Sequence, residues 1–182
     1  MNRKTIVVNL LGGPGCGKST TAASVFAELK WRGIDAELVT EYAKDKVWEE
    51  ATKILENQLY IFAKQEQRTN RLNSKVDVIL TDSSILLTLA YVKSKIHKGS
   101  LFKQLVLEEF NKYDNINYFL KRNDMYTENG RNHSFKEAIE KDIEIGNILN
   151  DNNINYETVN FERETVNYIV EQIIDRLKSD DV

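Results

Sequence analysis

The chain has 182 residues, of which 41% are hydrophobic, so it is long enough for one well-buried core and short for two domains. Its net charge of −3 gives no general attraction to nucleic acid, and no apolar run approaches the length of a membrane span. The single cysteine excludes an internal disulfide, and with two separated histidines it forms no zinc site, so a bound metal would take oxygen ligands. We expect one domain over residues 1–182, located in the cytoplasm.

The first predicted element is a buried strand at residues 5–11, because its apolar residues run almost without interruption. It leads into the sequence GGPGCGKST, which fits the phosphate-binding pattern G-x-x-x-x-G-K-[ST]. A helix is predicted to follow at residues 18–32, with Gly33 as its C-terminal cap. Strand, glycine-rich turn and helix are the context in which this pattern binds a polyphosphate.

The residues of this loop each have a chemical reason to be there. Glycines let successive backbone N–H groups approach an anion, and the start of the helix adds its positive dipole end. Lys18 is expected to reach the β- and γ-phosphates of ATP, and the Ser19 hydroxyl is expected to bind Mg²⁺. The residues predicted to bind the nucleotide are Gly12, Gly13, Pro14, Gly15, Cys16, Gly17, Lys18, Ser19 and Thr20.

A second strand is predicted at residues 34–40, and Glu41 follows it at the edge where open α/β sheets bind ligands. Glu41 is therefore the first candidate to bind or deprotonate an acceptor hydroxyl, although an acid in this place can equally cap the next helix. A long helical region is predicted at residues 47–73. Three of its polar residues recur at roughly helical spacing and either line an acceptor pocket or lie on a solvated face. They are Gln58, Gln65 and Arg68.

The third predicted strand, at residues 76–82, is an apolar run that ends in Asp82. An acid in this position is the usual partner of a phosphate loop, so Asp82 is predicted to hold Mg²⁺ together with Ser19, directly or through water. Asp82 is also the second candidate for the catalytic base, and capping of the next helix is the alternative interpretation. Helices are predicted to follow at residues 83–95 and 101–112.

A fourth strand is predicted at residues 115–121, and the polar, turn-rich segment at residues 122–134 has the placement of a small lid. Arg122 at the end of the strand and Arg131 in the lid are placed to meet the charge that develops on a transferred phosphoryl group. The alternative is that these arginines are solvated loop residues. Both are counted here as candidate catalytic residues.

The last predicted elements are a helix at residues 135–150, a strand at 154–160 and a helix at 162–178. Ser134 with Glu137 is a capping-box signature for the first of these helices. Five strands that alternate with helices imply a parallel sheet covered on both faces. The phosphate loop makes this a three-layer α/β fold of the P-loop NTPase type, for which the expected strand order is 2-3-1-4-5.

Four stretches, in this order and spacing, carry a resemblance to a known family. They are residues 12–20, Thr40-Glu41-Tyr42-Ala43-Lys44, Thr81-Asp82 and Glu128-Asn129-Gly130-Arg131. Nearly the whole chain resembles the small P-loop kinases, above all the ribosylnicotinamide kinase domain of bifunctional NAD-salvage proteins, and short bacteriophage proteins labelled as ATPases. Two departures concern the substrate. Thr81-Asp82-Ser83-Ser84 stands where the riboside kinases carry an acid on each side of a threonine, and their lid tryptophan is replaced around Met125-Tyr126.

The resemblance implies an ATP- and Mg²⁺-dependent kinase that transfers the γ-phosphate to a hydroxyl of a nucleoside-like or nucleotide-like acceptor. It would act in the cytoplasm, or in the host cytoplasm if a phage encodes it. One alternative is a kinase that acts on a modified, hydroxymethylated base or an end of DNA, a partner that the acidic net charge does not favour. Another is a P-loop ATPase that acts as a switch or assembly factor. The acceptor, the identity of the general base and the oligomeric state, monomer or dimer, stay open at this point.

Overall fold

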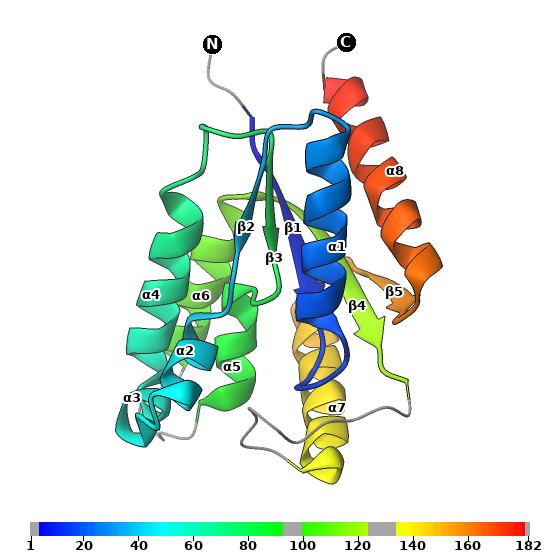
Figure 1. Ribbon diagram of the computed structural model, residues 1–182. Coiled ribbons are helices and arrows are strands. Elements are labelled where there is room, and N and C mark those ends of the chain that lie inside the picture. Colours follow the sequence, from blue (N-terminus) through cyan, green and yellow to red (C-terminus); the bar gives the residue numbers. More distant parts are fainter. Residues whose placement is uncertain (1–3, 93–99, 124–133, 181–182) are drawn as a thin grey trace.

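We describe the protein from a computed structural model, which covers residues 4–92, 100–123 and 134–180. Five parallel strands form one sheet with the order β2-β3-β1-β4-β5 (Figure 1). The strands are β1 (Ile6–Leu11), β2 (Ala36–Val39), β3 (Val78–Thr81), β4 (Asp114–Lys121) and β5 (Glu157–Asn160). The predicted order 2-3-1-4-5 is confirmed. β1 lies in the middle of the sheet, and all six of its residues are buried, as the uninterrupted apolar run predicted.

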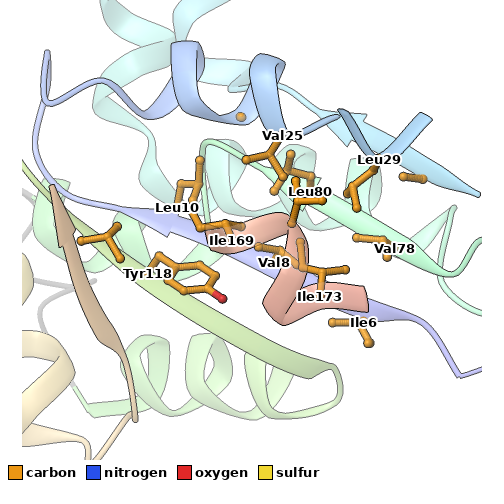
Figure 2. Close-up of a cluster of buried hydrophobic side chains, with 14 of the residues drawn as sticks. Ile6, Val8, Leu10, Val25, Leu29, Val78, Leu80, Tyr118, Ile169 and Ile173 are labelled. Atoms are coloured by element: carbon orange, nitrogen blue, oxygen red, sulfur yellow. The ribbon is translucent and has the colours of Figure 1, made fainter. Parts of the chain in front are cut away.

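Helices cover both faces of the sheet, and each face has its own cluster of buried side chains. On one face, α1 (Lys18–Trp31) and α8 (Arg163–Asp180) pack on alternate residues of β1, with Val25, Leu29, Ile169 and Ile173 around Val8 (Figure 2). The other face carries α4 (Gln58–Asn70), α6 (Ser100–Asn111) and α7 (Phe135–Asp151). The sheet is therefore the middle of three layers, and β1 is held from both sides.

Two predicted helix ends are confirmed by their hydrogen bonds. Gly33 has a φ of 77°, its N–H donates to Lys30 O, and the Ile34 N–H donates to Leu29 O, which together terminate α1. At the start of α7, the Ser134 side chain accepts from the Glu137 N–H while the Glu137 side chain accepts from the Ser134 N–H. These caps could be predicted because each depends on residues adjacent in sequence.

The prediction of a single long helix at residues 47–73 is wrong. The structure has three helices there: α2 (Tyr42–Trp48), α3 (Thr52–Glu56) and α4. Glu50 adopts a positive φ of 53°, which ends the helical path, and Asn57 has a non-helical ψ of 80°. The Asn57 side chain accepts a hydrogen bond from the Tyr60 N–H and so begins α4. The break places α2 and α3 beyond the carboxyl end of β2, beside the start of α4 (Figure 1).

The structure also differs from the single helix predicted at residues 83–95. Its described part is a 3₁₀ turn, η1 (Ile85–Leu87), followed by the single-turn helix α5 (Thr88–Tyr91), after which Val92 is extended with a ψ of 111°. Residues 93–99 lie outside the described residues. The side chains of η1 are buried against α4 and α6, and this packing favours a tight turn over a regular exposed helix. No helix in the described part of the chain is long and apolar enough to cross a membrane.

Candidate active site

The predicted phosphate loop connects β1 to α1 and has the backbone shape that its glycines allow. Gly12, Gly15 and Gly17 have φ values of 133°, 77° and 102°, a region that residues with a side chain seldom adopt. Gly17 directly precedes Lys18, the first residue of α1. The N-terminus of α1 therefore opens into the loop, where its N–H groups and positive dipole end favour an anion.

The loop is also held tightly from two sides. A Cβ atom on Gly17 would lie 2.2 Å from the Phe161 ring, which follows β5. A Cβ on Gly13 would lie 2.6 Å from Ala138 O on α7. Real side chains do not tolerate such distances, so the glycines at these positions serve close packing in addition to backbone conformation. The loop is thus fixed between the end of the sheet and α7.

Lys18 lies over the loop that it belongs to. Its Nζ donates to Gly12 O at 2.8 Å and to Gly13 O at 2.9 Å. The side chain is half-buried and lines the cavity described below. Its positive charge lowers the pKa of Glu41. Lys18 and Glu41, which are separate in sequence, line the same cavity.

Asp82 follows β3 and is 5% exposed. Its Oδ1 atom is buried, as is the Oγ atom of Ser84, and neither has a hydrogen-bond partner among the described residues. A buried carboxylate oxygen without a partner is costly, and such atoms in native structures are usually satisfied by a water or an ion. Ser19 lies on the same cavity as Ser83 and Ser84, the residues that follow Asp82. Carboxylate and hydroxyl oxygens are what Mg²⁺ prefers, so Asp82 and Ser19 fit the predicted metal.

Glu41 follows β2 and is the residue before α2. Its side chain makes no capping hydrogen bond in the described structure, so the alternative interpretation of Glu41 as a helix cap finds no support. Burial raises the pKa of the Glu41 carboxyl, the negative charge of Asp82 raises it further, and Lys18 opposes both. Glu41 is therefore a carboxyl group with an increased proton affinity at the wall of a cavity.

One cavity of about 650 Å³ is lined by Lys18, Ser19 and Glu41, and also by the two serines that follow Asp82. The loop contributes Pro14, Gly15, Gly17, Lys18, Ser19 and Thr20, whereas Gly12, Gly13 and Cys16 are buried. The rest of the lining comes largely from α2 to α5, and we call these residues the acceptor half of the cavity. It includes Lys44, Val47, Trp48, Glu56, Gln58, Gln65, Thr88 and Tyr91. Of the three polar residues considered on the predicted long helix, Gln58 and Gln65 thus line the cavity and are buried, and Arg68 contacts Thr40 and Asp45 instead.

Several of these residues were not predicted. Trp48 and Tyr91 lie at the ends of α2 and α5 and line the cavity, which the helices predicted there did not indicate. Burial raises the pKa of Tyr91, so this side chain remains protonated in the cavity wall. Ser84 carries no sequence signal beyond its position after Asp82. Only its burial and its unpartnered hydroxyl single it out.

Arg122 follows β4 and contacts the backbone of the phosphate loop. Its guanidinium donates to Pro14 O at 3.2 Å and to Ala138 O at 3.1 Å, and it pairs with the Asp142 carboxylate on α7. Asp142 also accepts a hydrogen bond of 2.6 Å from the Gly13 N–H. The structure thus places Arg122 beside the loop and adds Asp142, which no motif indicated, and the predicted role of Arg122 toward a transferred phosphoryl group stays a prediction.

Most of the predicted lid at residues 122–134, namely residues 124–133, lies outside the described residues. Arg131 is among them, as are Glu128, Asn129 and Gly130 of the family-like stretch. The proposed role of Arg131 therefore stays a prediction from sequence.

A parallel sheet of this order, with a glycine loop between its central strand and the following helix and an acid after the neighbouring strand, defines a P-loop nucleotide-binding protein. Residues 7–167 match the family described as an AAA domain, and the chain belongs to this family. No curated protein matches the sequence. Among solved structures, the crystal structure of NadR protein in complex with NR superimposes with a TM-score of 0.63 and 19% sequence identity. The alignment covers 88% of this chain but 46% of that one, so this chain spans less than half the length of that protein, and the likeness is one of fold.

Proposed function

We propose that the protein is an ATP-dependent kinase that transfers the γ-phosphate to a hydroxyl group of a nucleoside-like or nucleotide-like acceptor. The observation that carries this proposal is the composition of the cavity, which combines the phosphate loop, Glu41 and an acceptor half in one space. Phosphoryl transfer demands positioning, charge neutralisation and exclusion of water rather than covalent chemistry by the protein. A cavity with room beside the triphosphate supports a second substrate.

The roles on the nucleotide side follow from the loop. Lys18 and the loop N–H groups bind the phosphates, and Ser19 and Asp82 hold Mg²⁺. Bound Mg²⁺ supplies charge neutralisation at the phosphate oxygens. Arg122 is proposed to add positive charge beside the loop, and Arg131 to meet the charge on the transferred group. The motif, the burial of Asp82 and the unpartnered Oδ1 atom support these assignments.

Glu41 is proposed to receive the proton of the acceptor hydroxyl as the new O–P bond forms and the bond between the γ-phosphorus and the β,γ-bridging oxygen breaks. A carboxylate with a raised pKa is a stronger base than an ordinary one, and burial raises the pKa of Glu41. Asp82 remains the alternative base, but an acid that holds a metal is less available for proton transfer.

The charges around the acceptor half favour an acceptor without a phosphate group. Glu41 and Glu56 contribute two acids to the lining, against Lys44 as the cation on that side among the described lining residues. A dianionic phosphate would be repelled by the two acids, whereas a sugar hydroxyl would be bound. Trp48 and Tyr91 add flat faces suited to a planar ring. A nucleoside is therefore the first class of acceptor to test, and NR, the ligand named for the NadR structure, belongs among the compounds tried.

Hydrolysis of ATP without an acceptor is the second candidate function. The match to the family described as an AAA domain supports it. In that case the acceptor half would serve a partner or a conformational state, and water would be the attacking group.

Acceptor-dependent turnover tests the proposal. ADP release is measured with ATP and Mg²⁺ alone, and then with nucleosides, nucleotides and hydroxymethylated DNA added one class at a time. We expect ADP release above the basal rate, with phosphate incorporated into one class, and loss of both in Glu41→Gln. Rapid ADP release that no acceptor raises and that Glu41→Gln does not change would show that the protein is a hydrolase.

A further inference from the structure

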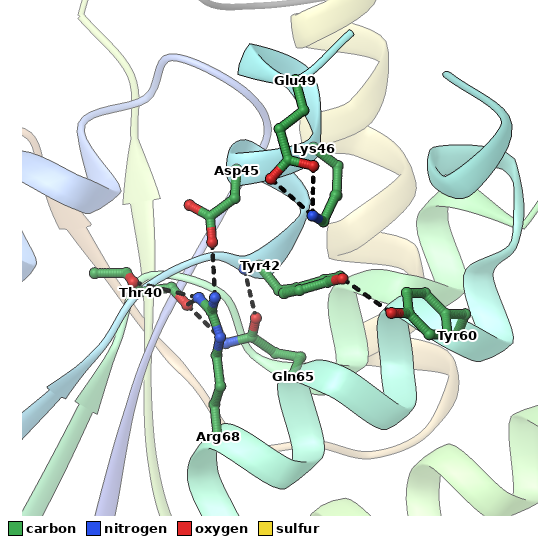
Figure 3. A network of polar contacts seen from close by, with 8 residues as sticks. All are labelled: Thr40, Tyr42, Asp45, Lys46, Glu49, Tyr60, Gln65 and Arg68. Carbon is green, nitrogen blue, oxygen red and sulfur yellow. Dashed lines mark hydrogen bonds and ion pairs between the residues drawn. The ribbon is translucent and has the colours of Figure 1, made fainter. Parts of the chain in front are cut away.

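Gln65 on α4 is a polar side chain that is 1% exposed, and both ends of its amide group are used. Its Oε1 accepts from the Tyr42 N–H at 2.9 Å, and its Nε2 donates to Thr40 O at 3.3 Å (Figure 3). These two backbone groups lie on either side of Glu41. One side chain from a distant helix therefore binds the main chain immediately before and immediately after the proposed base.

Arg68, one turn further along α4, binds the same segment. Its guanidinium donates to Thr40 O at 3.0 Å and to Asp45 Oδ2 on α2 at 2.7 Å, and it lies over the Tyr42 ring at 5.0 Å (Figure 3). Arg68 thereby fastens the first turn of α2 to α4. We call Gln65 and Arg68 together the α4 clamp, with Gln65 as its buried part and Arg68 as its half-exposed part.

The segment needs such a clamp because regular structure stops before it. The pairing of β2 with β3 ends at Val39, which lies opposite Thr81, and α2 begins only at Tyr42. Thr40 and Glu41 thus belong to neither element, and the backbone groups next to Glu41 take side-chain partners. The buried Gln65 amide makes hydrogen bonds to a backbone N–H and a backbone C=O at the same time, and this limits the backbone conformations that residues 40–42 can adopt.

Glu41 also has an electrostatic reason to move if it is not held. It faces Lys18 at the start of α1 and Asp82 after β3, with Lys44 and Asp45 on its own helix. Burial is the largest effect against the ionised carboxyl, and the two acids add to it, whereas the two lysines favour the ionised form. Because water would relieve the burial, a fixed Thr40–Tyr42 backbone helps to keep the carboxyl in the cavity.

We propose that Gln65 is the positioning residue of Glu41: its two hydrogen bonds fix the Thr40–Tyr42 backbone so that the Glu41 carboxyl is held in the cavity opposite the phosphate loop. This inference rests on the proposed kinase function for its catalytic meaning. Gln65 also lines the cavity, so a change on the wall of the acceptor half is transmitted directly to the base. Displacement of a catalytic group by about 1 Å can cost roughly a hundredfold in rate.

The test uses Gln65→Met, which preserves length and removes both hydrogen bonds. Gln67→Met is the matched control, because it makes the same change on the same helix at an exposed position. With an acceptor that the parent phosphorylates, we expect kcat of Gln65→Met to fall about ten- to a hundredfold while the Kd for ATP changes less than about twofold. Gln67→Met is expected to match the parent in both. Equal kcat in Gln65→Met and Gln67→Met would overturn the proposal.

Amide hydrogen exchange gives a readout that does not depend on any acceptor. The Tyr42 N–H should exchange at least about tenfold faster in Gln65→Met than in the parent, because its hydrogen-bond acceptor is gone. Exchange at Tyr42 that stays as slow as in the parent overturns the clamp whatever the activity. If no acceptor supports turnover even in the parent, the proposed function fails, whereas faster exchange at Tyr42 still supports the anchoring by Gln65.

Arg68→Met covers the case in which Gln65→Met does not fold. Arg68 is half-exposed, so its removal leaves the core intact, and it should give a smaller effect in the same direction, about two- to tenfold in kcat, with faster exchange at Tyr42. An Arg68→Met variant that folds and shows parental kcat and parental exchange would contradict the clamp.

Discussion

The two halves of the cavity are built in different ways. The phosphate half comes from one continuous stretch of chain, and backbone conformations at Gly12, Gly15 and Gly17 determine its shape. The acceptor half collects side chains from α2 to α5, whose placement depends on contacts such as those of Gln65 with the backbone on either side of Glu41. A site made of backbone is encoded locally and tolerates few changes, whereas a site made of side chains from several short helices can change one residue at a time. Conserved chemistry and variable substrate choice can thus reside in one cavity.

The largest effect is expected on the phosphate side. Lys18→Ala should reduce phosphoryl transfer about a thousandfold or more, because it removes the charge aimed at the phosphates. The fold should persist, since the Lys18 hydrogen bonds go to loop carbonyls and the side chain is half-buried. Turnover and the thermal midpoint are measured side by side, with Lys30→Ala at the exposed end of the same helix as the control. Unchanged turnover in Lys18→Ala would contradict the assignment of the loop.

The next largest effect is expected for Asp82→Asn. The variant should need more Mg²⁺ and turn over about a hundred- to a thousandfold more slowly, while ATP binding falls less. Because Asp82 Oδ1 is buried without a partner among the described residues, loss of the charge should also raise the thermal midpoint in metal-free buffer. A magnesium titration and a melting curve measure the two effects. If both curves overlay those of the parent, Asp82 does not contribute to a metal site.

Glu41→Gln tests the residue that lies between the two halves of the cavity, and it should lower kcat about a hundredfold. This is near the lower end for loss of a general base, because little proton transfer is needed in the loose transition state of phosphoryl transfer. Burial raises the pKa of Glu41, so the acid limb of the parent profile should lie above the ordinary carboxyl range and disappear in the variant.

The same substitution makes a prediction about stability. A raised folded-state pKa stabilises the fold below the ordinary carboxyl pKa, and this contribution is lost as the pH rises through the raised value. At neutral pH Glu41 therefore costs stability, because the unfolded chain ionises this carboxyl more readily than the folded one, and Glu41→Gln should melt higher there than the parent, with the difference shrinking in acid. A variant that is less stable than the parent at neutral pH would contradict the raised pKa of Glu41.

The smallest effect is expected at the rim of the acceptor half. Trp48 lines the cavity although it is 62% exposed, so Trp48→Ala should raise the acceptor KM about two- to tenfold with little change in kcat or ATP affinity. Trp31→Ala is the matched control, because Trp31 is 83% exposed at the end of α1 and does not line the cavity. An effect of Trp48→Ala on ATP affinity rather than on the acceptor would contradict the division of the cavity.

The same contrast explains how much could be predicted from sequence. The order of the strands, the loop, the position of Asp82 and the caps at Gly33 and Ser134 were predictable, because each follows from neighbouring residues or from the apolar runs. The division of the predicted long helix into α2, α3 and α4 was not. A charged, weakly periodic stretch continues through Glu50 and Asn57, and only tertiary packing makes those residues into breaks.

The contacts between distant residues were equally hidden. Asp142 accepts hydrogen bonds from the Gly13 N–H, 129 residues earlier in the chain, and from the Arg122 guanidinium. Gln65 likewise contacts the backbone of Thr40 and Tyr42, which lie 25 and 23 residues before it. The helical spacing of Gln58, Gln65 and Arg68 singles out this glutamine from Gln67, but it cannot decide between a cavity wall and a solvated face. Burial separates them, and burial is a property of the assembled fold.

The central position of β1 in the sheet has a consequence for folding during synthesis. The strand that carries the phosphate loop is made first, but its two neighbours, β3 and β4, are made much later, and the loop's contact with Asp142 later still. During synthesis β1 can pair with β3 only after residue 81 has been made, and its other edge stays open until β4 is complete. A chain interrupted before β4 would therefore leave one edge of the strand that carries the phosphate loop without its partner.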